Sequence, residues 1–167
     1  MGYVAVDRGQ EFIELLSKKN PEFLSCLSEG KNNLASIATR YPKYNARLKR
    51  IMTIESQIEY CSQSVFGQKI KGGSNESNMI TMYIKSLSTG EPLQVNTGSR
   101  PLMAAYRRGE KLFYTKAGQF NYACASCHTP QGGAMGKHLR GQTPTTVFGD
   151  AAQYPVYHTK LGLISMA

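Results

Sequence analysis

Five consecutive residues in the second half of the chain have the types and the spacing for covalent chemistry. They are Cys124, Ala125, Ser126, Cys127 and His128. Two thiols about one helical turn apart can each add to a vinyl group of a porphyrin, and the adjacent imidazole can then bind the iron. A redox pair or half of a zinc site is the alternative, but a zinc site needs a second ligand pair, which is not evident at a suitable spacing. The pattern therefore predicts one covalent haem c, with His128 as its proximal metal ligand.

The iron ligand opposite His128 is harder to predict. Met135, His138 and His158 carry suitable donor atoms. Met135 follows His128 so closely that packing within a loop is the better interpretation, and the polar stretch around His138 is typical of a solvated histidine. His158 has the better reach, but the sequence leaves the sixth ligand open.

Length, charge and hydropathy limit the classes of protein. The 167 residues suffice for one domain or two small ones, with part of the core supplied by a porphyrin. Twenty Lys and Arg against 11 Asp and Glu give a formal charge of +9, which is spread over both halves. Such a surface favours small oxyanions and acidic protein partners, and by itself does not indicate nucleic acid. No apolar run is long enough to predict a membrane span.

The two cysteines outside the motif, Cys26 and Cys61, could pair with each other. Because c-type haem is attached on the oxidising side of a membrane, we expect a periplasmic protein whose leader is not part of this sequence. In that compartment the pair predicts a Cys26–Cys61 disulfide. Closing a loop of about 35 residues would contribute about 3 to 4 kcal/mol by loop entropy. Two buried free thiols are the alternative.

Apolar spacing predicts a chain that is mainly helical. Tyr41-Pro42 is expected to be extended, because the residue before a proline avoids the helical region. Breaker residues predict a linker over 91–99, and residues 129–153, rich in Gly, Thr and Pro, are expected to form an irregular loop. The expected helices run from a cap at Asp7 to Asn20, from Pro21 to Cys26, from about residue 45 to Cys61, from residue 75 toward Gly90, and from Leu102 toward Gly118.

The two halves of the chain repeat each other. Arg8-Gly9 and Arg108-Gly109 each lie in an expected amphipathic helix, a cysteine follows in each half, and Tyr-Pro-x-Tyr recurs at 41–44 and 154–157. The repeat predicts an all-α fold of two tandem cytochrome-c-like modules. The domain prediction is a haem-less module over 1–90 with the Cys26–Cys61 disulfide, a linker over 91–99, and a haem module over 100–167.

The second module is expected to be incomplete at its C-terminus. The separation of Cys61 from Tyr41, projected forward from Tyr154, passes Ala167. The helix that would match the one ending at Cys61 is therefore expected to lie beyond this sequence.

Four stretches give the chain a resemblance to a known family. They are residues 108–114, 121–128, 136–141 and 154–157, and with them the chain resembles the SoxA subunit of the SoxAX cytochromes of bacterial sulfur oxidation. The haem-less first module resembles the mono-haem subtype. By this resemblance Cys124 and Cys127 are the thioether anchors and His128 the proximal ligand. The family's active-site cysteine is expected to lie beyond Ala167, so the catalytic residue of this chain is unknown.

The resemblance also implies a reaction and its partners. The family is classed as an L-cysteine S-thiosulfotransferase, which joins thiosulfate oxidatively to a cysteine of the carrier SoxYZ while electrons leave through haem to the cytochrome SoxX. Two alternatives stay open. One is a periplasmic electron-transfer cytochrome with a Met or His sixth ligand and no sulfur chemistry, and the other is a non-catalytic remnant that supports a partner.

Overall fold

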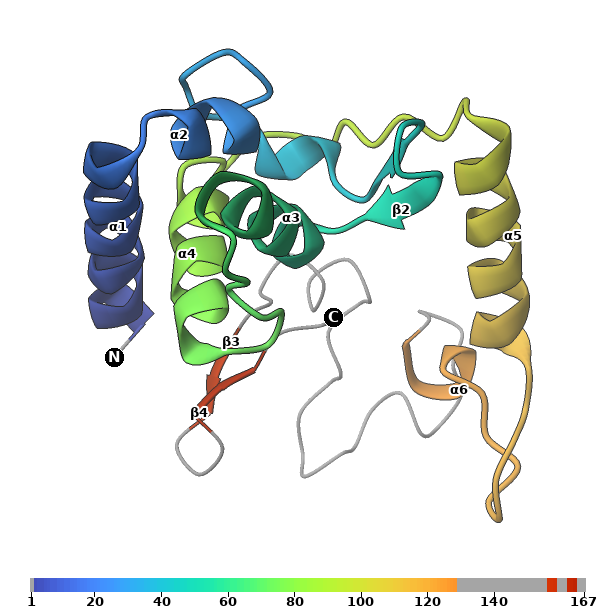
Figure 1. Ribbon diagram of the computed structural model, residues 1–167. Helices are drawn as coiled ribbons and strands as arrows, with labels where there is room; N and C mark the ends of the chain where they lie inside the picture. Colours follow the sequence, from blue (N-terminus) through green and yellow to red (C-terminus); the bar gives the residue numbers. More distant parts are fainter. Residues whose placement is uncertain (1, 129–155, 159–161, 165–167) are drawn as a thin grey trace. The chain divides into compact units, whose positions relative to one another are not determined.

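The structure is a computed structural model that describes residues 2–128, 156–158 and 162–164 (Figure 1). The chain divides into two compact units. Unit 1 comprises residues 1–96 and 154–167, and unit 2 comprises residues 97–153. The irregular loop expected over 129–153 lies outside the described residues.

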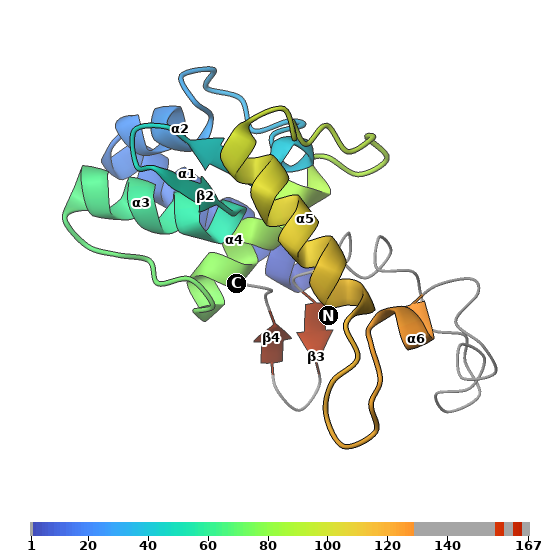
Figure 2. The same cartoon turned by 90° about the vertical axis from the view of Figure 1, so that its right-hand side faces the viewer.

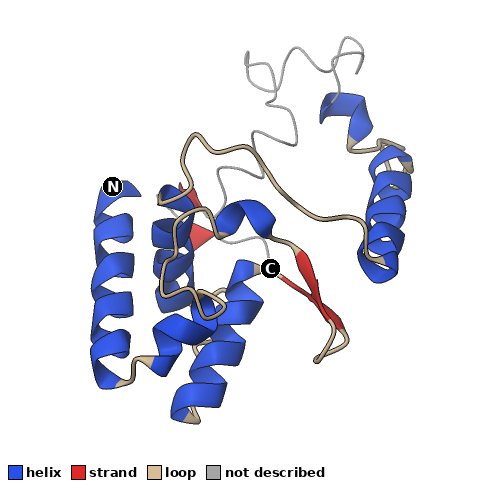
Figure 3. Ribbon diagram, turned by 90° about the horizontal axis from the view of Figure 1, so that it is seen from above, coloured by secondary structure: helices blue, strands red, loops and turns tan. Residues whose placement is uncertain are grey.

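Most of the described secondary structure is helical, as the sequence predicts, and the strands form two small antiparallel hairpins, β1 with β2 and β3 with β4 (Figure 3). None of the described helices is both long and apolar enough to cross a membrane. The described elements are α1 (Gly2–Lys19), α2 (Glu22–Leu27), the 3-10 helix η1 (Ala38–Arg40), β1 (Lys43–Asn45), β2 (Arg50–Met52), α3 (Ile54–Phe66), α4 (Asn75–Ser86), α5 (Arg100–Tyr114), α6 (Ala125–His128), β3 (Val156–His158) and β4 (Gly162–Ile164).

The core of unit 1 lies among the α-helices α1 to α4. Helix α1 packs along α4, and α3 contacts both α2 and α4 (Figures 1 and 3). Full burial of a large aliphatic or aromatic side chain contributes about 1.5 to 3 kcal/mol. The fully buried large apolar side chains are Phe23, Ile37, Met52, Ile58, Ile80 and Ile84.

Helices α1 and α4 approach each other most closely at Gly9. A methyl group at this position would collide with the Met79 carbonyl oxygen and lie 2.9 Å from Cβ of Tyr83. Only glycine lets the two helix backbones come this close. The Arg-Gly pair of the first half is therefore a packing requirement of unit 1.

Helix α1 begins earlier than the sequence predicts. Asp7 was expected as its cap, but the helix starts at Gly2, and Gln10 donates a hydrogen bond to Glu14 2.9 Å away. Ala5, which the prediction left outside the helix, is buried. Tertiary packing of the first turn therefore overrides the local capping pattern.

Helix α3 begins later than the sequence predicts. The expected start near residue 45 is wrong, because Asn45 ends strand β1 and its side chain accepts a hydrogen bond from the Leu48 N–H at 3.0 Å. The chain turns there and returns as β2. Thr53 then caps α3 in a reciprocal pair with Ser56, whose hydroxyl accepts the Thr53 N–H at 2.7 Å. This capping box fixes the start of the helix at Ile54.

Helices α4 and α5 lie where the apolar spacing places them, and each has a serine cap. Ser74 accepts the Ser77 N–H at 3.2 Å, and Ser99 accepts the Leu102 N–H at 3.4 Å. Both helices end a few residues earlier than expected. The glycines expected to stop them, Gly90 and Gly118, lie in turns with positive φ instead.

Candidate functional site

The Cys-x-x-Cys-His residues lie in a single helical turn of unit 2. Cys124 directly precedes α6, and α6 contains Cys127 and His128 (Figure 2). The turn is closed by Ser126, whose N–H donates to the Ala123 carbonyl at 2.9 Å and whose hydroxyl accepts the Ala123 N–H at 3.1 Å. A helical backbone places positions three apart on one face. The backbone therefore has the spacing that attachment of one porphyrin by two thiols requires.

Cys124 is exposed and takes no part in the disulfide. A thiol has to be free and accessible to add to a vinyl group. The side chains of Cys127 and His128 lie outside what the structure describes, so their part of the prediction stays a prediction.

Unit 2 carries large apolar side chains close to this turn in the sequence. Helix α5 contacts α6, yet among its described residues only Leu102 is buried. Leu112 on α5 is 68 % exposed and Phe120 77 % exposed, and the Phe120 ring stacks on Tyr122 with centroids 6.0 Å apart. A porphyrin presents broad apolar faces, and burial of apolar side chains against it would be favourable. The donor set and its apolar surroundings fit a covalent haem.

The described residues contain no group of three or more His, Cys, Asp or Glu side chains that could hold a metal ion directly. The second ligand pair that a zinc site needs is thus not found in this part of the chain. Of the candidates for the sixth iron ligand, Met135 and His138 lie outside the described residues. His158 lies in β3, and its side chain is not described.

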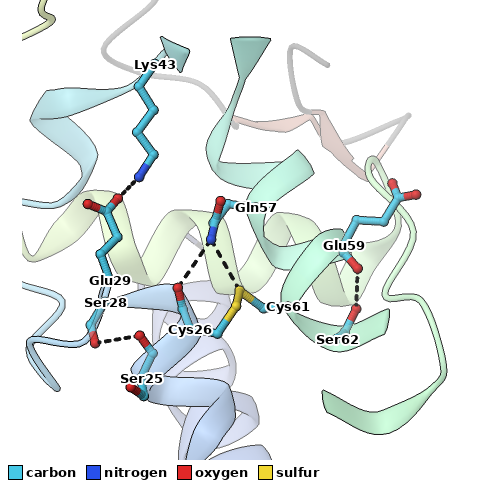
Figure 4. Close-up of a disulfide and its surroundings, with 9 residues drawn as sticks. All are labelled: Ser25, Cys26, Ser28, Glu29, Lys43, Gln57, Glu59, Cys61 and Ser62. Carbon is cyan, nitrogen blue, oxygen red and sulfur yellow. Dashed lines mark hydrogen bonds and ion pairs between the residues drawn. A yellow bond between two sulfur atoms is a disulfide. The ribbon is translucent and has the colours of Figure 1, made fainter. Parts of the chain in front are cut away.

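The predicted Cys26–Cys61 disulfide is confirmed. It joins α2 to α3 across 35 residues of sequence, and Cys61 is completely buried. The side-chain amide of Gln57 donates to the Cys26 carbonyl oxygen at 3.2 Å and to the Cys61 sulfur at 3.3 Å (Figure 4). One polar side chain thus contacts both halves of the bridge, which lies among the apolar residues of the core.

Tyr41 is a buried titratable group of this core. Burial raises the pKa of its phenol well above the usual range, while the positive charge of Arg40 acts in the opposite direction. Its hydroxyl has no hydrogen-bond partner among the described residues. The neutral phenol is therefore the form that folding favours.

Some residues of the site carry no strong sequence signal. Phe120 belongs to no motif, and its position just before the cysteine pair is the clue that could have identified it. The expected active-site cysteine has no counterpart here, because the chain has four cysteines and each is already placed in the disulfide or in the Cys-x-x-Cys-His motif.

The mainly helical fold and the Cys-x-x-Cys-His sequence are both consistent with a cytochrome c domain, and a family model identifies that domain. Residues 9–93 match the family model described as SoxA/TsdA, cytochrome c domain. The chain belongs to this family. The matched residues lie in unit 1, which has no Cys-x-x-Cys-His sequence, so a cytochrome c domain without this motif precedes the residues that carry it.

Curated relatives with the name L-cysteine S-thiosulfotransferase subunit SoxA match most of the chain. The protein from Pseudaminobacter salicylatoxidans is 31 % identical over 163 residues, which cover 96 % of this chain and 55 % of the relative. The protein from Chlorobaculum thiosulfatiphilum is 29 % identical over 140 residues, 84 % of this chain and 46 % of the relative. The chain thus spans about half the length of these relatives.

A solved structure shares the fold. The crystal structure of SoxXA from P. pantotrophus superposes with a TM-score of 0.67 at 22 % identity, over 85 % of this chain and 52 % of that chain. At this identity the likeness concerns the fold alone.

Proposed function

We propose that this chain is a SoxA-type c-type cytochrome subunit that works in the periplasm with a SoxX-like cytochrome and a SoxYZ-like carrier protein. The observation that carries the proposal is the free, exposed Cys124 at the start of the α6 turn, in a chain of the SoxA/TsdA family. The name of the curated relatives supports the reaction, and the SoxXA structure supports the type of partner.

In the proposed reaction, thiosulfate and a cysteine thiol of the carrier form a new sulfur–sulfur bond. The S–H bond of the thiol breaks, one proton is released, and two electrons pass to the SoxX-like subunit. When bound, the haem supplies the redox centre that accepts electrons one at a time. The catalytic cysteine of this reaction is not assigned to a residue of this chain.

The chain's own residues have defined roles in this proposal. Cys124 and Cys127 would hold the porphyrin by two thioether bonds, and His128 would bind the iron. The side chains of Leu112 and Phe120, which are exposed here, would exclude water from the apolar faces of a bound porphyrin. The surplus of basic residues attracts the thiosulfate anion and acidic partner surfaces at long range, and salt weakens this attraction.

The first test is haem attachment. The full chain would be produced in a host that attaches c-type haem, and a pyridine haemochrome spectrum with intact-mass measurement would count covalent haems. We expect one haem that survives denaturation. A purified chain with the mass of the bare polypeptide would show that no haem is attached and would contradict the proposal.

The second test is turnover. The haem-loaded chain would be mixed with a SoxX-like cytochrome, a SoxYZ-like carrier and thiosulfate, and the mass of the carrier and the reduction of haem would be followed. We expect the carrier to gain one thiosulfate-derived group while the haem becomes reduced. Haem reduction by other donors without any mass change of the carrier would identify an electron-transfer cytochrome instead.

A further inference from the structure

Unit 1 has a polar hollow of its own that no sequence motif marks. Its volume is about 340 Å³. It lies between the loop before η1, η1 itself and the chain that follows α4. The residues that line it are Lys31, Asn33, Ala35, Ser36, Arg40 and Gln94.

The lining offers hydrogen-bond donors and positive charge, and it includes no Asp or Glu. Lys31 and Arg40 are cations, and Asn33, Ser36 and Gln94 each carry an N–H or O–H group. Among the described residues, no ion pair joins Lys31 or Arg40 to a carboxylate. The acidic residue nearest in sequence to Lys31 is Glu29, which pairs with Lys43 instead (Figure 4).

Hydrogen bonds fix the backbone around the hollow. The side-chain oxygen of Asn33 accepts the Ala35 N–H at 2.8 Å. The side-chain N–H groups of Asn33 can therefore donate to a ligand. The Gln94 N–H donates to the Thr39 carbonyl at 2.8 Å, which holds Gln94 beside η1. The Thr39 hydroxyl donates to the Ser36 carbonyl at 2.8 Å. These bonds hold the backbone of the hollow in place, so binding would cost less conformational entropy than in a loop that has to order first.

We propose that this hollow binds a small tetrahedral oxyanion of the sulfate and thiosulfate class. Arg40 is a half-buried residue whose guanidinium can donate two parallel hydrogen bonds to an oxyanion, and the exposed Lys31 adds a second positive charge. The volume also accommodates waters that bridge the anion to Asn33 and Gln94. All of these residues belong to unit 1, so the proposal does not depend on haem attachment at Cys124.

The test is a titration of the full, haem-loaded chain with sodium thiosulfate and sodium sulfate at constant ionic strength, with chloride as the background anion. Amide chemical shifts of Ala35, Ser36 and Gln94 would report binding at the hollow, and calorimetry would give the affinity. We expect saturable shifts of these amides. In the double variant Lys31→Gln with Arg40→Gln, we expect the affinity to fall by about tenfold or more, because both charge-assisted donors are lost.

The matched control is Lys18→Gln with Arg47→Gln, which removes the same charge at exposed positions of unit 1 outside the hollow. It should bind like the unmodified chain. Equal weakening in both double variants would show a general charge effect and overturn the proposal, as would the absence of saturation. Tighter binding of succinate than of sulfate would also overturn it, because it would identify a carboxylate site.

Discussion

The two halves of the chain contain the same Arg-Gly pair in a helix, yet the two glycines have different surroundings. Gly9 on α1 faces α4, where any side chain would collide with Met79. Gly109 on α5 has no described atom within 4 Å of the position that a side chain would take. The repeated Arg-Gly pair therefore indicates that both halves form a helix at this point. Among the described residues, close helix packing requires the glycine only at Gly9.

The two units also differ in what holds them together. Unit 1 has a continuous apolar core crossed by a disulfide. Of the buried apolar residues among those described, only Leu102 belongs to unit 2, whose other large apolar side chains are mostly exposed. The comparison indicates that protein contacts suffice for unit 1. The described part of unit 2 forms no such core by itself, and in the proposed function a porphyrin would cover its exposed apolar side chains.

Loss of the two cysteines proposed to hold the haem should produce the largest difference in stability between the two units. Replacing Cys124→Ala and Cys127→Ala should abolish covalent haem and greatly speed amide hydrogen exchange in α5, with little change in α3. Haem staining of a denaturing gel and hydrogen exchange by mass spectrometry would measure both effects. The matched control, Cys26→Ala with Cys61→Ala, should retain covalent haem. Slow exchange of α5 without haem would show that unit 2 folds by protein contacts alone.

Loss of the disulfide should have the next largest effect, and it should fall on unit 1. The Cys26→Ala, Cys61→Ala variant should lower the free energy of unfolding of unit 1 by about 3 to 4 kcal/mol, because the unfolded chain regains the entropy of a 35-residue loop. Urea denaturation, read by exchange of the α2 and α3 amides, would measure it. An unchanged midpoint would mean that the apolar core alone determines the stability of unit 1.

The two glycines allow a direct test of the comparison. Gly9→Ala should destabilise unit 1 by about 1 to 3 kcal/mol, because α1 and α4 have to move apart to admit the methyl group. Gly109→Ala should leave stability unchanged or raise it by up to about 1 kcal/mol, because alanine is the better helix former. Thermal unfolding of both variants would decide. A comparable loss in both would reveal a helix packed on α5 at Gly109.

A smaller effect is expected at Tyr41. Tyr41→Phe should stabilise unit 1 by up to about 1 kcal/mol near neutral pH, because it removes a buried hydroxyl that has no partner among the described residues. Since burial raises the pKa of Tyr41 in the folded state, the unfolded state loses its proton first. Stability should therefore fall as the pH rises above about 10. Denaturation curves from pH 8 to about 11 should show a shallower fall in Tyr41→Phe, and identical slopes would contradict this explanation.

The sequence predicts the parts of this fold that depend on short-range patterns. Apolar spacing located α4 and α5, and the parity of the cysteines identified the Cys26–Cys61 bridge. The start of α3 was missed because Asn45 closes a turn with its own side chain, which helical spacing does not reveal. The start of α1 was missed because a buried Ala5 carries no capping signal.

Among the functional residues, too, some are marked by a sequence motif and others are brought together only by the fold. A spacing motif marks Cys124, Cys127 and His128, because the proposed attachment of a porphyrin requires residues close together in the sequence. In the hollow of unit 1, the backbone hydrogen bond from Gln94 to Thr39 holds Gln94 near Arg40. Because these residues are far apart in the sequence, no sequence motif predicts the hollow.

The bridge between Cys26 and Cys61 also bears on how the polypeptide matures. The sequence contains four cysteines, and oxidising enzymes can couple any two thiols that meet. Of these four, early closure of the bridge within the first unit would leave Cys124 and Cys127 for the proposed attachment of a porphyrin. A production host that oxidises thiols faster than it attaches haem should therefore accumulate cross-linked, colourless protein.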